Sequence, residues 1–364
     1  MKSIFKKCLF ILLICIVIFF SIQYIFILNE GFENNQTHSN TNLVIDKCNR
    51  VSFNKIKDDY TSYINQYVPK NSIESISIKT GVDSSKKHDY NKIIQLYKEH
   101  LVEFSNSEKE KLQELIEEIV NDDKFNQKHN STYSMFVSKF KKQMKWNLLK
   151  TRNLELNLPC TISNYILFPE SQLKTKNWCN IKETLMHEQI HILQRQNQEL
   201  FNEEYKRLFN NPLLSNTMEP KFHLLPINKD LIDYSAIDVK HIQIQNPDED
   251  DLEWIIYDHN LHNYYVVPYI VNRTAYYNVL NKNRNIERFS NKNSKNKNMP
   301  YISTITAFRL DLDKSSGPNS YIVTGNQVKI QELEYYKYLM GITNNKHINI
   351  AHPNETFTDL FLTM

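Results

Sequence analysis

Two histidines and a glutamate lie close together as His187, Glu188 and His191, in the sequence HEQIH. On a helix, side chains four residues apart lie one turn apart on the same face, so both imidazoles can bind a single Zn²⁺. A glutamate beside them can take a proton from a zinc-bound water as that water attacks a carbonyl group. The spacing predicts a zinc site with His187 and His191 as ligands and Glu188 as general base.

The segment around HEQIH is expected to be a buried helix. Between Ile181 and about Phe209 the apolar residues fall on most sides of a helical axis, which is typical of a helix enclosed by other elements. Imidazole and carboxylate groups on such a helix are costly without partners, and a metal ion supplies one. The context therefore favours metal binding over a chance occurrence of the motif.

A second acidic motif near the C-terminus can complete the site. A catalytic zinc usually has three protein ligands and keeps one position for water, so one more ligand is needed. In AHPNETFTDLF, Pro353 is expected to open a helix with Glu355 in its first turn and Asp359 four residues later on the same face. Glu355 is a candidate third ligand and Asp359 a candidate partner of a ligand. The alternative interpretation is an ordinary capped helix.

HEQIH followed by NETFTD resembles the motifs of the gluzincin metallopeptidases, the clan of thermolysin. The resemblance implies that His187, His191 and Glu355 bind zinc. It also implies that Asp359 hydrogen-bonds His187, and that zinc-activated water hydrolyses peptide bonds.

The fold that the resemblance implies is an α+β, zincin-like metallopeptidase body with an active-site helix and an edge strand. The candidate edge strand is 161–168, which in gluzincins would lie beside an extended peptide substrate. More than 160 residues separate HEQIH from NETFTD, a longer connection than thermolysin has. The intervening part is therefore expected to be an insertion or a subdomain.

An apolar segment precedes the body. Cys8–Leu28 contains no charged residue and is long enough to cross a hydrocarbon core of roughly 30 Å as a helix. It predicts a transmembrane anchor in a lipid bilayer, the alternative being a cleaved signal peptide, for which the segment is long and lacks an A-x-A-like site. Lys2, Lys6 and Lys7 before it predict a cytoplasmic N-terminus and a luminal or extracellular body.

Glycosylation sequons and cysteines fit that compartment without proving it. Sequons occur at Asn35, Asn130 and Asn272, and a fourth, at Asn354, overlaps the predicted metal site and is expected to be unused. Three cysteines, Cys48, Cys160 and Cys179, follow the apolar segment, too few for a disulfide scaffold. Either a pairing of Cys160 with Cys179 that leaves Cys48 over, or three unpaired thiols, is consistent with the sequence.

Charge and glycine content argue against nucleic acid and nucleotide ligands. The three lysines before the apolar segment account for the excess of 44 basic over 41 acidic residues, so the rest of the chain is formally neutral. Nucleic-acid-binding domains usually carry a basic excess. The chain has only 5 glycines, none spaced as a phosphate-binding loop. The predicted partner besides the bilayer is a peptide or protein substrate.

Three parts are expected along the chain: a cytoplasmic stub and transmembrane anchor at 1–30, a polar stalk or loosely ordered region at 31–88, and the metallohydrolase body at 89–364. Apolar periodicity within the body predicts helices from about Ile93, from Leu112 after a capping box of Ser107 and Glu110, and around 133–149. Strands are expected at 154–169, as a hairpin at 252–271 and from Tyr301, and further helices at 331–340 and from Pro353.

The leading functional interpretation is a membrane-anchored zinc metallopeptidase. A zinc site can also hydrolyse other amides or esters, so a non-peptidase zinc hydrolase is an alternative. A catalytically inert, membrane-anchored surface glycoprotein on a zincin-like body is another, although a pure binding protein has no need of Glu188. Several histidines and tyrosines could stabilise an oxyanion, and spacing does not choose among them.

Overall fold

The structure, a computed structural model, describes residues 51–54, 56, 58–80, 90–121, 144–209, 221–244, 246, 248, 252–283, 306–313, 315–316, 319–342 and 352–363. Residues 49–364 form one compact unit. Its helices and β-sheets make an α+β fold, which confirms the predicted fold class at that level.

The first sheet contains three parallel strands, β1 (Val51–Phe53), β3 (Trp146–Thr151) and β5 (Tyr165–Pro169). β4 (Cys160–Ile162) lies at its edge, is joined to β5 by a two-residue turn and pairs antiparallel with β5. β2 (Leu101–Val102) pairs antiparallel with β3. The predicted strand at 154–169 is therefore a 3₁₀ turn followed by a hairpin. Of the two hairpin strands, β4 lies at the edge of the sheet and β5 lies inside it.

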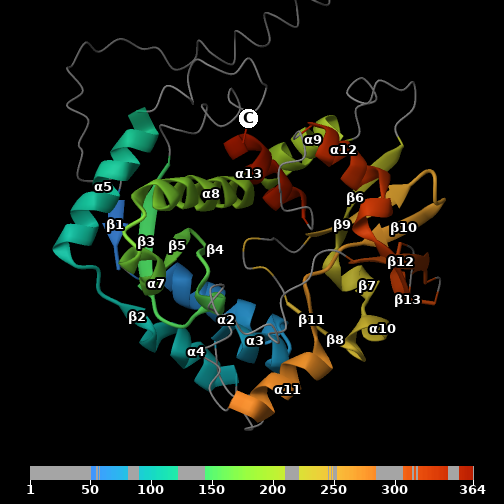
Figure 1. The fold of residues 1–364 in the computed structure, drawn as a ribbon, viewed down its shortest axis with the longest axis horizontal. Helices are drawn as coiled ribbons and strands as arrows, with labels where there is room; N and C mark the ends of the chain where they lie inside the picture. The colour runs from blue at the N-terminus through green and yellow to red at the C-terminus, as the bar shows by residue number, and fades with distance from the viewer. Residues whose placement is uncertain are drawn as a thin grey trace, which may run out of the picture. The chain divides into compact units, whose positions relative to one another are not determined.

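Helices cover both faces of this sheet, because successive strand residues point to opposite sides. Leu148 and Phe168 pack in one core cluster, and Leu149 and Leu167 in another. The first cluster includes residues of α5 (Asn106–Asn121) and α8 (Trp178–Gln196); the second includes residues of α2 (Asp58–Lys70), α3 (Ile73–Thr80) and α4 (Tyr90–Glu99). Figure 1 shows α8 across the sheet from α2, α3 and α4.

The second sheet has the strand order β6-β9-β10-β12-β13-β7 and is antiparallel except for the last pair. The β9–β10 hairpin confirms the one predicted within 252–271. A separate pair joins β8 to β11. The bounds are β6 Phe222–Asn228, β7 Ile232–Asp233, β8 His241–Gln243, β9 Leu252–Asp258, β10 Asn263–Val266, β11 Ile270–Asn272, β12 Thr306–Leu312 and β13 Tyr321–Lys329.

Aromatic packing joins the C-terminal helix to the second sheet. Phe357, on α13 (Pro353–Thr363), contacts Phe201 and Tyr205 of α9 (Gln198–Phe209), and Tyr205 contacts Trp254 of β9. Pro353 opens α13, as predicted. The remaining helices are α7 Glu170–Lys174, α10 Ser235–Asp238, α11 Arg273–Asn283 and α12 Glu334–Ile342, with 3₁₀ turns at Glu155–Asn157, Lys229–Leu231 and Ile330–Glu332.

The predicted start of the body at residue 89 is wrong for residues 51–80. β1 pairs with β3, and Tyr60 and Ile64 of α2 have no exposed surface. Polar composition suggested a stalk, but apolar residues at helical spacing bury one face of α2. The stalk prediction for residues 31–50 and the whole of the prediction for residues 1–30 lie outside the described residues.

Three local predictions also need correction. The cap of α5 is formed by Ser105, whose backbone N–H donates to Glu108 Oε2 at 2.7 Å, and not by Ser107. Residues 146–151 are strand β3 and do not continue a helix. The long helix expected from Ile181 is two helices, α8 and α9, separated at Asn197.

The membrane anchor predicted at Cys8–Leu28 lies outside the described residues. Within the described part, no helix is long and apolar enough to cross a membrane. Cys160 is buried and Cys179 is exposed, and both thiols are free, so the Cys160–Cys179 pairing is absent from the structure.

Candidate metal centre

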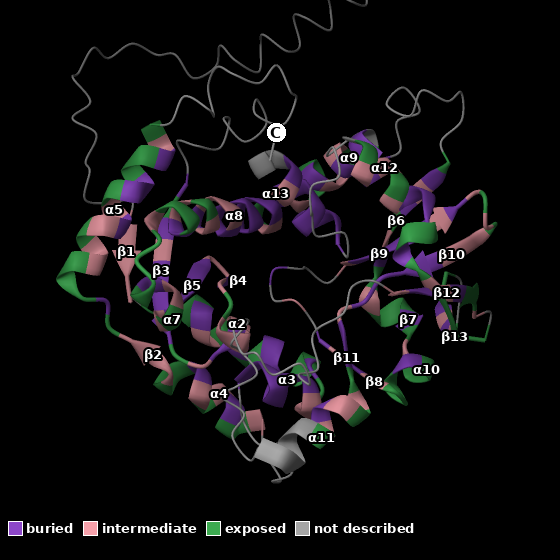
Figure 2. Ribbon diagram, viewed as in Figure 1, coloured by how far each residue is buried: buried purple, intermediate pink, exposed green. Residues whose placement is uncertain are grey.

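α8 brings both histidines and the glutamate of HEQIH to one site. Asn177 caps the helix, since its side chain accepts a hydrogen bond from Asn180 N at 3.4 Å. Every residue from Glu188 to Gln194 is buried, and Figure 2 shows the change from an exposed start to a buried C-terminal half. The predicted burial is therefore confirmed for the C-terminal half of α8, where unpaired polar groups are costly.

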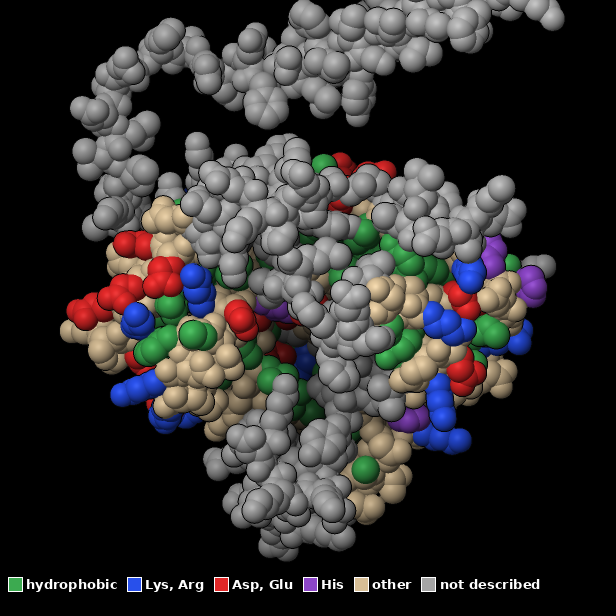
Figure 3. Space-filling model, turned by 45° about the horizontal axis from the view of Figure 1, so that its top comes forward, with side chains coloured by type: hydrophobic (Ala, Val, Ile, Leu, Met, Phe, Trp, Pro, Cys, Tyr) green, Lys and Arg blue, Asp and Glu red, His purple; other side chains and the backbone are tan. Residues whose placement is uncertain are grey.

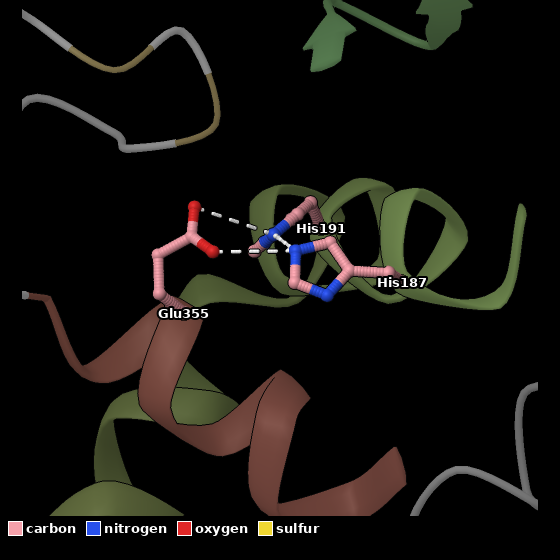
Figure 4. Close-up of side chains that lie close together, drawn as sticks. All are labelled: His187, His191 and Glu355. Atoms are coloured by element: carbon pink, nitrogen blue, oxygen red, sulfur yellow. Dashed lines mark hydrogen bonds and ion pairs between the residues drawn. The ribbon is translucent and has the colours of Figure 1, made fainter. Parts of the chain in front are cut away.

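α13 supplies the acidic residue. His352 forms its cap, because His352 Nδ1 accepts from Asn354 N at 3.1 Å and His352 O accepts from Thr356 N at 3.0 Å. Glu355 then lies in the first turn with its carboxylate toward α8 (Figure 4). His352 thus sets where α13 begins.

The three predicted ligands converge on one point. His187 Nε2 lies 3.0 Å from His191 Nε2 and 3.2 Å from Glu355 Oε2, and His191 Nε2 lies 3.5 Å from Glu355 Oε1. Tetrahedral Zn²⁺ at about 2.0–2.1 Å from its ligands holds them about 3.3–3.4 Å apart. The two distances to Glu355 involve different carboxylate oxygens. With one ligand atom from each residue, the three atoms lie within 4.8 Å of one another, close enough to share one ion.

Glu188 has an unsatisfied carboxylate oxygen beside this point. The residue is 4% exposed, and its Oε2 has no hydrogen-bond partner among the described residues. Burial, followed by the charge of Asp248, raises the pKa of Glu188 well above its usual value. An orphaned, buried carboxylate is the group expected of a base that acts on a water or substrate.

Neighbouring charges shift the pKa values of two candidate ligands, His191 and Glu355. Burial opposes a proton on His191, but Glu355 and Asp248 outweigh it and raise the pKa of His191 to about 10. Burial also opposes ionisation of Glu355, yet the two histidines hold the pKa of Glu355 well below its usual range. Since several carboxylates surround one histidine in a buried site, a dication would relieve their mutual repulsion.

Asp359 lies where the resemblance implies a partner of His187. Its Oδ1 is 3.6 Å from His187 Nδ1, a distance for an ion pair and longer than a hydrogen bond. The His187 side chain is partly exposed to solvent, with 22% of its surface accessible. Figure 3 shows histidine and acidic surface inside a hollow on the face that it draws. The 22% exposure of the His187 side chain makes the candidate site accessible from outside.

Two residues that sequence reasoning missed also reach the site. Asn246 Nδ2 donates to Glu355 Oε1 at 2.5 Å. Asp248 is 7% exposed and accepts from Thr161 N and Thr161 Oγ1 at 2.6 and 2.7 Å. Both lie between β8 and β9, in an Asn- and Asp-rich stretch that has no metal-ligand spacing, so nothing in the sequence singled them out.

The edge strand β4 is partly occupied by these contacts. Thr161 N–H faces away from β5 and donates to Asp248, and Ser163 O accepts from Arg195. Pro159 has no N–H to offer. A peptide cannot pair with Thr161 N–H while Asp248 accepts its hydrogen bond.

Comparisons with known proteins add no family to these observations. No family model, curated protein or solved structure matches this chain. The zinc site and the gluzincin resemblance therefore depend on the residues and on their geometry.

Proposed function

We propose that this protein is a membrane-anchored, zinc-dependent metallopeptidase of the gluzincin type. The carrying observation is that His187, His191 and Glu355, from helices far apart in sequence, bring one donor atom each to within 4.8 Å of one another. The membrane anchor at residues 8–28 belongs to this proposal on the strength of its sequence alone.

Each residue has a distinct task in the proposed reaction. His187, His191 and Glu355 hold the zinc ion, which when bound lowers the pKa of a water and polarises a carbonyl group. Glu188 accepts the proton of the attacking water and passes it to the leaving amine. Its Oε2 has no hydrogen-bond partner among the described residues, so this oxygen is available to accept the proton.

Asp248 gives a specific reason to retain a non-peptidase zinc hydrolase as the second candidate. Extended peptides are commonly bound by adding a strand to a sheet edge, which uses outward backbone groups of that edge. At β4 the outward Thr161 N–H already donates to Asp248. Small amides or esters need no such pairing, so they fit this arrangement without displacement of Asp248.

The test is the zinc content of full-length protein purified in detergent, measured by elemental mass spectrometry, followed by a peptide-library and ester screen. We expect about one zinc per chain, lost in His187→Ala and reduced in Glu355→Ala. Cleavage of peptides identifies the first candidate, and cleavage of esters or small amides alone identifies the second. Well-folded wild-type protein without zinc would sink both.

A further inference from the structure

Gln194 lies one helical turn beyond His191 and contacts both motifs. It is 2% exposed. Its Oε1 lies 2.6 Å from His191 Nδ1, and its Nε2 donates to Asn354 O at 2.9 Å and to Thr358 Oγ1 at 3.2 Å. One amide thus joins a histidine of HEQIH to the helix that carries Glu355.

The direction of these hydrogen bonds is set by chemistry. Asn354 O can only accept, so the amide nitrogen of Gln194 must face α13 and its oxygen must face His191. An amide oxygen can only accept, so Nδ1 of His191 carries a proton. The lone pair of a neutral His191 is then on Nε2, the nitrogen that faces His187 and Glu355.

The acceptors on α13 are themselves held in place. Thr358 Oγ1 donates to Asn354 O at 2.8 Å, which leaves the hydroxyl oxygen free to accept from Gln194. Tyr205 OH donates to Asn354 Oδ1 at 2.9 Å from α9. Asn354 directly precedes Glu355, so Gln194 is bonded to a fixed point next to the third ligand.

We propose that Gln194 is the positioning residue of this site. It selects the Nδ1–H tautomer of His191 and bonds α8 to α13. His191 and Glu355, which are 164 residues apart in sequence, are thereby held at a fixed distance from each other. The proposal rests on the proposed zinc function and assigns a role that the two motifs do not include. Partners of this kind typically change metal affinity about 10–100-fold when removed.

The experiment compares full-length wild-type protein with Gln194→Met, which has similar length and no amide. Zinc affinity is measured by chelator competition, and the Nδ1–H of His191 is followed by NMR of ¹⁵N-histidine-labelled protein. We expect zinc affinity about 10–100-fold weaker in Gln194→Met, with loss of the slowly exchanging, hydrogen-bonded Nδ1–H signal. The matched control is Gln189→Met, since Gln189 is equally buried on α8 and its Oε1 has no partner among the described residues.

A conservative variant separates orientation of His191 from general stability. Gln194→Glu keeps an acceptor for Nδ1–H but loses the donor to Asn354 O, so we expect the NMR signal to return and zinc affinity to lie between wild type and Gln194→Met. Equal zinc affinity in folded Gln194→Met and wild type would overturn the positioning role alone. Absence of zinc from wild type would overturn the proposed function itself, whatever the NMR signal shows.

Discussion

Glu188 is the residue on which catalysis is expected to depend. It is buried beside the metal ligands, it lacks a partner for Oε2 among the described residues, and burial raises its pKa. These properties separate it from His187 and His191, whose ring nitrogens face each other. A residue that acts on protons without holding the metal gives a clear experimental separation of binding from chemistry.

Glu188→Gln should keep zinc and lose hydrolysis. The amide fills the same space but cannot accept a proton, so kcat should fall by about 10²–10⁴. Zinc content and kcat are measured on the same preparation, with Glu183→Gln, an exposed glutamate of α8, as control. Unchanged kcat in Glu188→Gln would remove Glu188 from the mechanism.

α13 carries Glu355, the proposed third ligand, and Phe357 anchors this helix to its neighbours. Phe357 has no exposed surface and packs against Phe201 and Tyr205. Phe357→Ala should destabilise the protein by about 3–5 kcal/mol and, in the fraction that stays folded, weaken zinc binding because Glu355 shifts. Denaturant unfolding and zinc titration check this.

Phe308→Ala is the matched control for Phe357→Ala. Phe308 is 1% exposed and lies on β12, in a core cluster that contains no residue of α8 or α13. The Phe308→Ala variant should lose a similar amount of stability and keep the zinc affinity of wild type. Equal loss of zinc affinity in the two variants would show that the metal responds only to overall stability.

The cap of α5 makes a pH-dependent contribution. Partial burial opposes ionisation of Glu108, but Ser105 N–H and Lys150 outweigh it and hold the pKa of Glu108 below its usual value of 4.5. A folded-state pKa that is lowered contributes stability above the unfolded pKa, and this stability is lost as pH falls through the folded value.

Glu108→Gln should therefore lower the free energy of unfolding by about 1–2 kcal/mol at pH 7. The difference from wild type should shrink as pH falls below about 4.5 and then through the lowered folded-state pKa, where folded wild-type Glu108 also becomes neutral. Urea unfolding at pH 7, 5 and 3.5 measures it. Glu114→Gln, in an exposed pair with Lys111, should show no such pH-dependent difference.

At the level of the whole molecule, residues 51–80 are part of the body. β1 adds a strand to the first sheet, and α2 buries Tyr60 and Ile64 against its second face. Lys79 is 1% exposed at its side chain and pairs with the buried Glu155 at 3.3 Å, so its removal would leave a buried charge unpaired.

A chain that begins at residue 49 should fold, and one that begins at residue 89 should not. Circular dichroism and a cooperative unfolding transition distinguish the two. A cooperative unfolding transition in the chain that begins at residue 89 would support the original prediction that the body starts there.

Spacing in the sequence was sufficient for the local part of the site. His187 and His191 lie one turn apart because a helix repeats every 3.6 residues, and Pro353 places Glu355 in a first turn for an equally local reason. The burial of the C-terminal half of α8 followed from apolar periodicity in the same way, whereas the α+β class came from the resemblance. At residues 51–80 the polar composition led to the wrong prediction of a stalk, because it overlooked apolar residues at helical spacing.

Tertiary structure alone decided which distant groups meet. Packing of α13 against α8 brings Glu355 to the two histidines across 164 residues, and no local pattern encodes that distance. Asp248, Asn246 and Gln194 acquire their contacts in the same way, since each depends on where another element lies. The spacing of a motif fixes the relative positions of side chains on one helix. The proposed metal site draws on two helices, so it also depends on the core packing that holds them together.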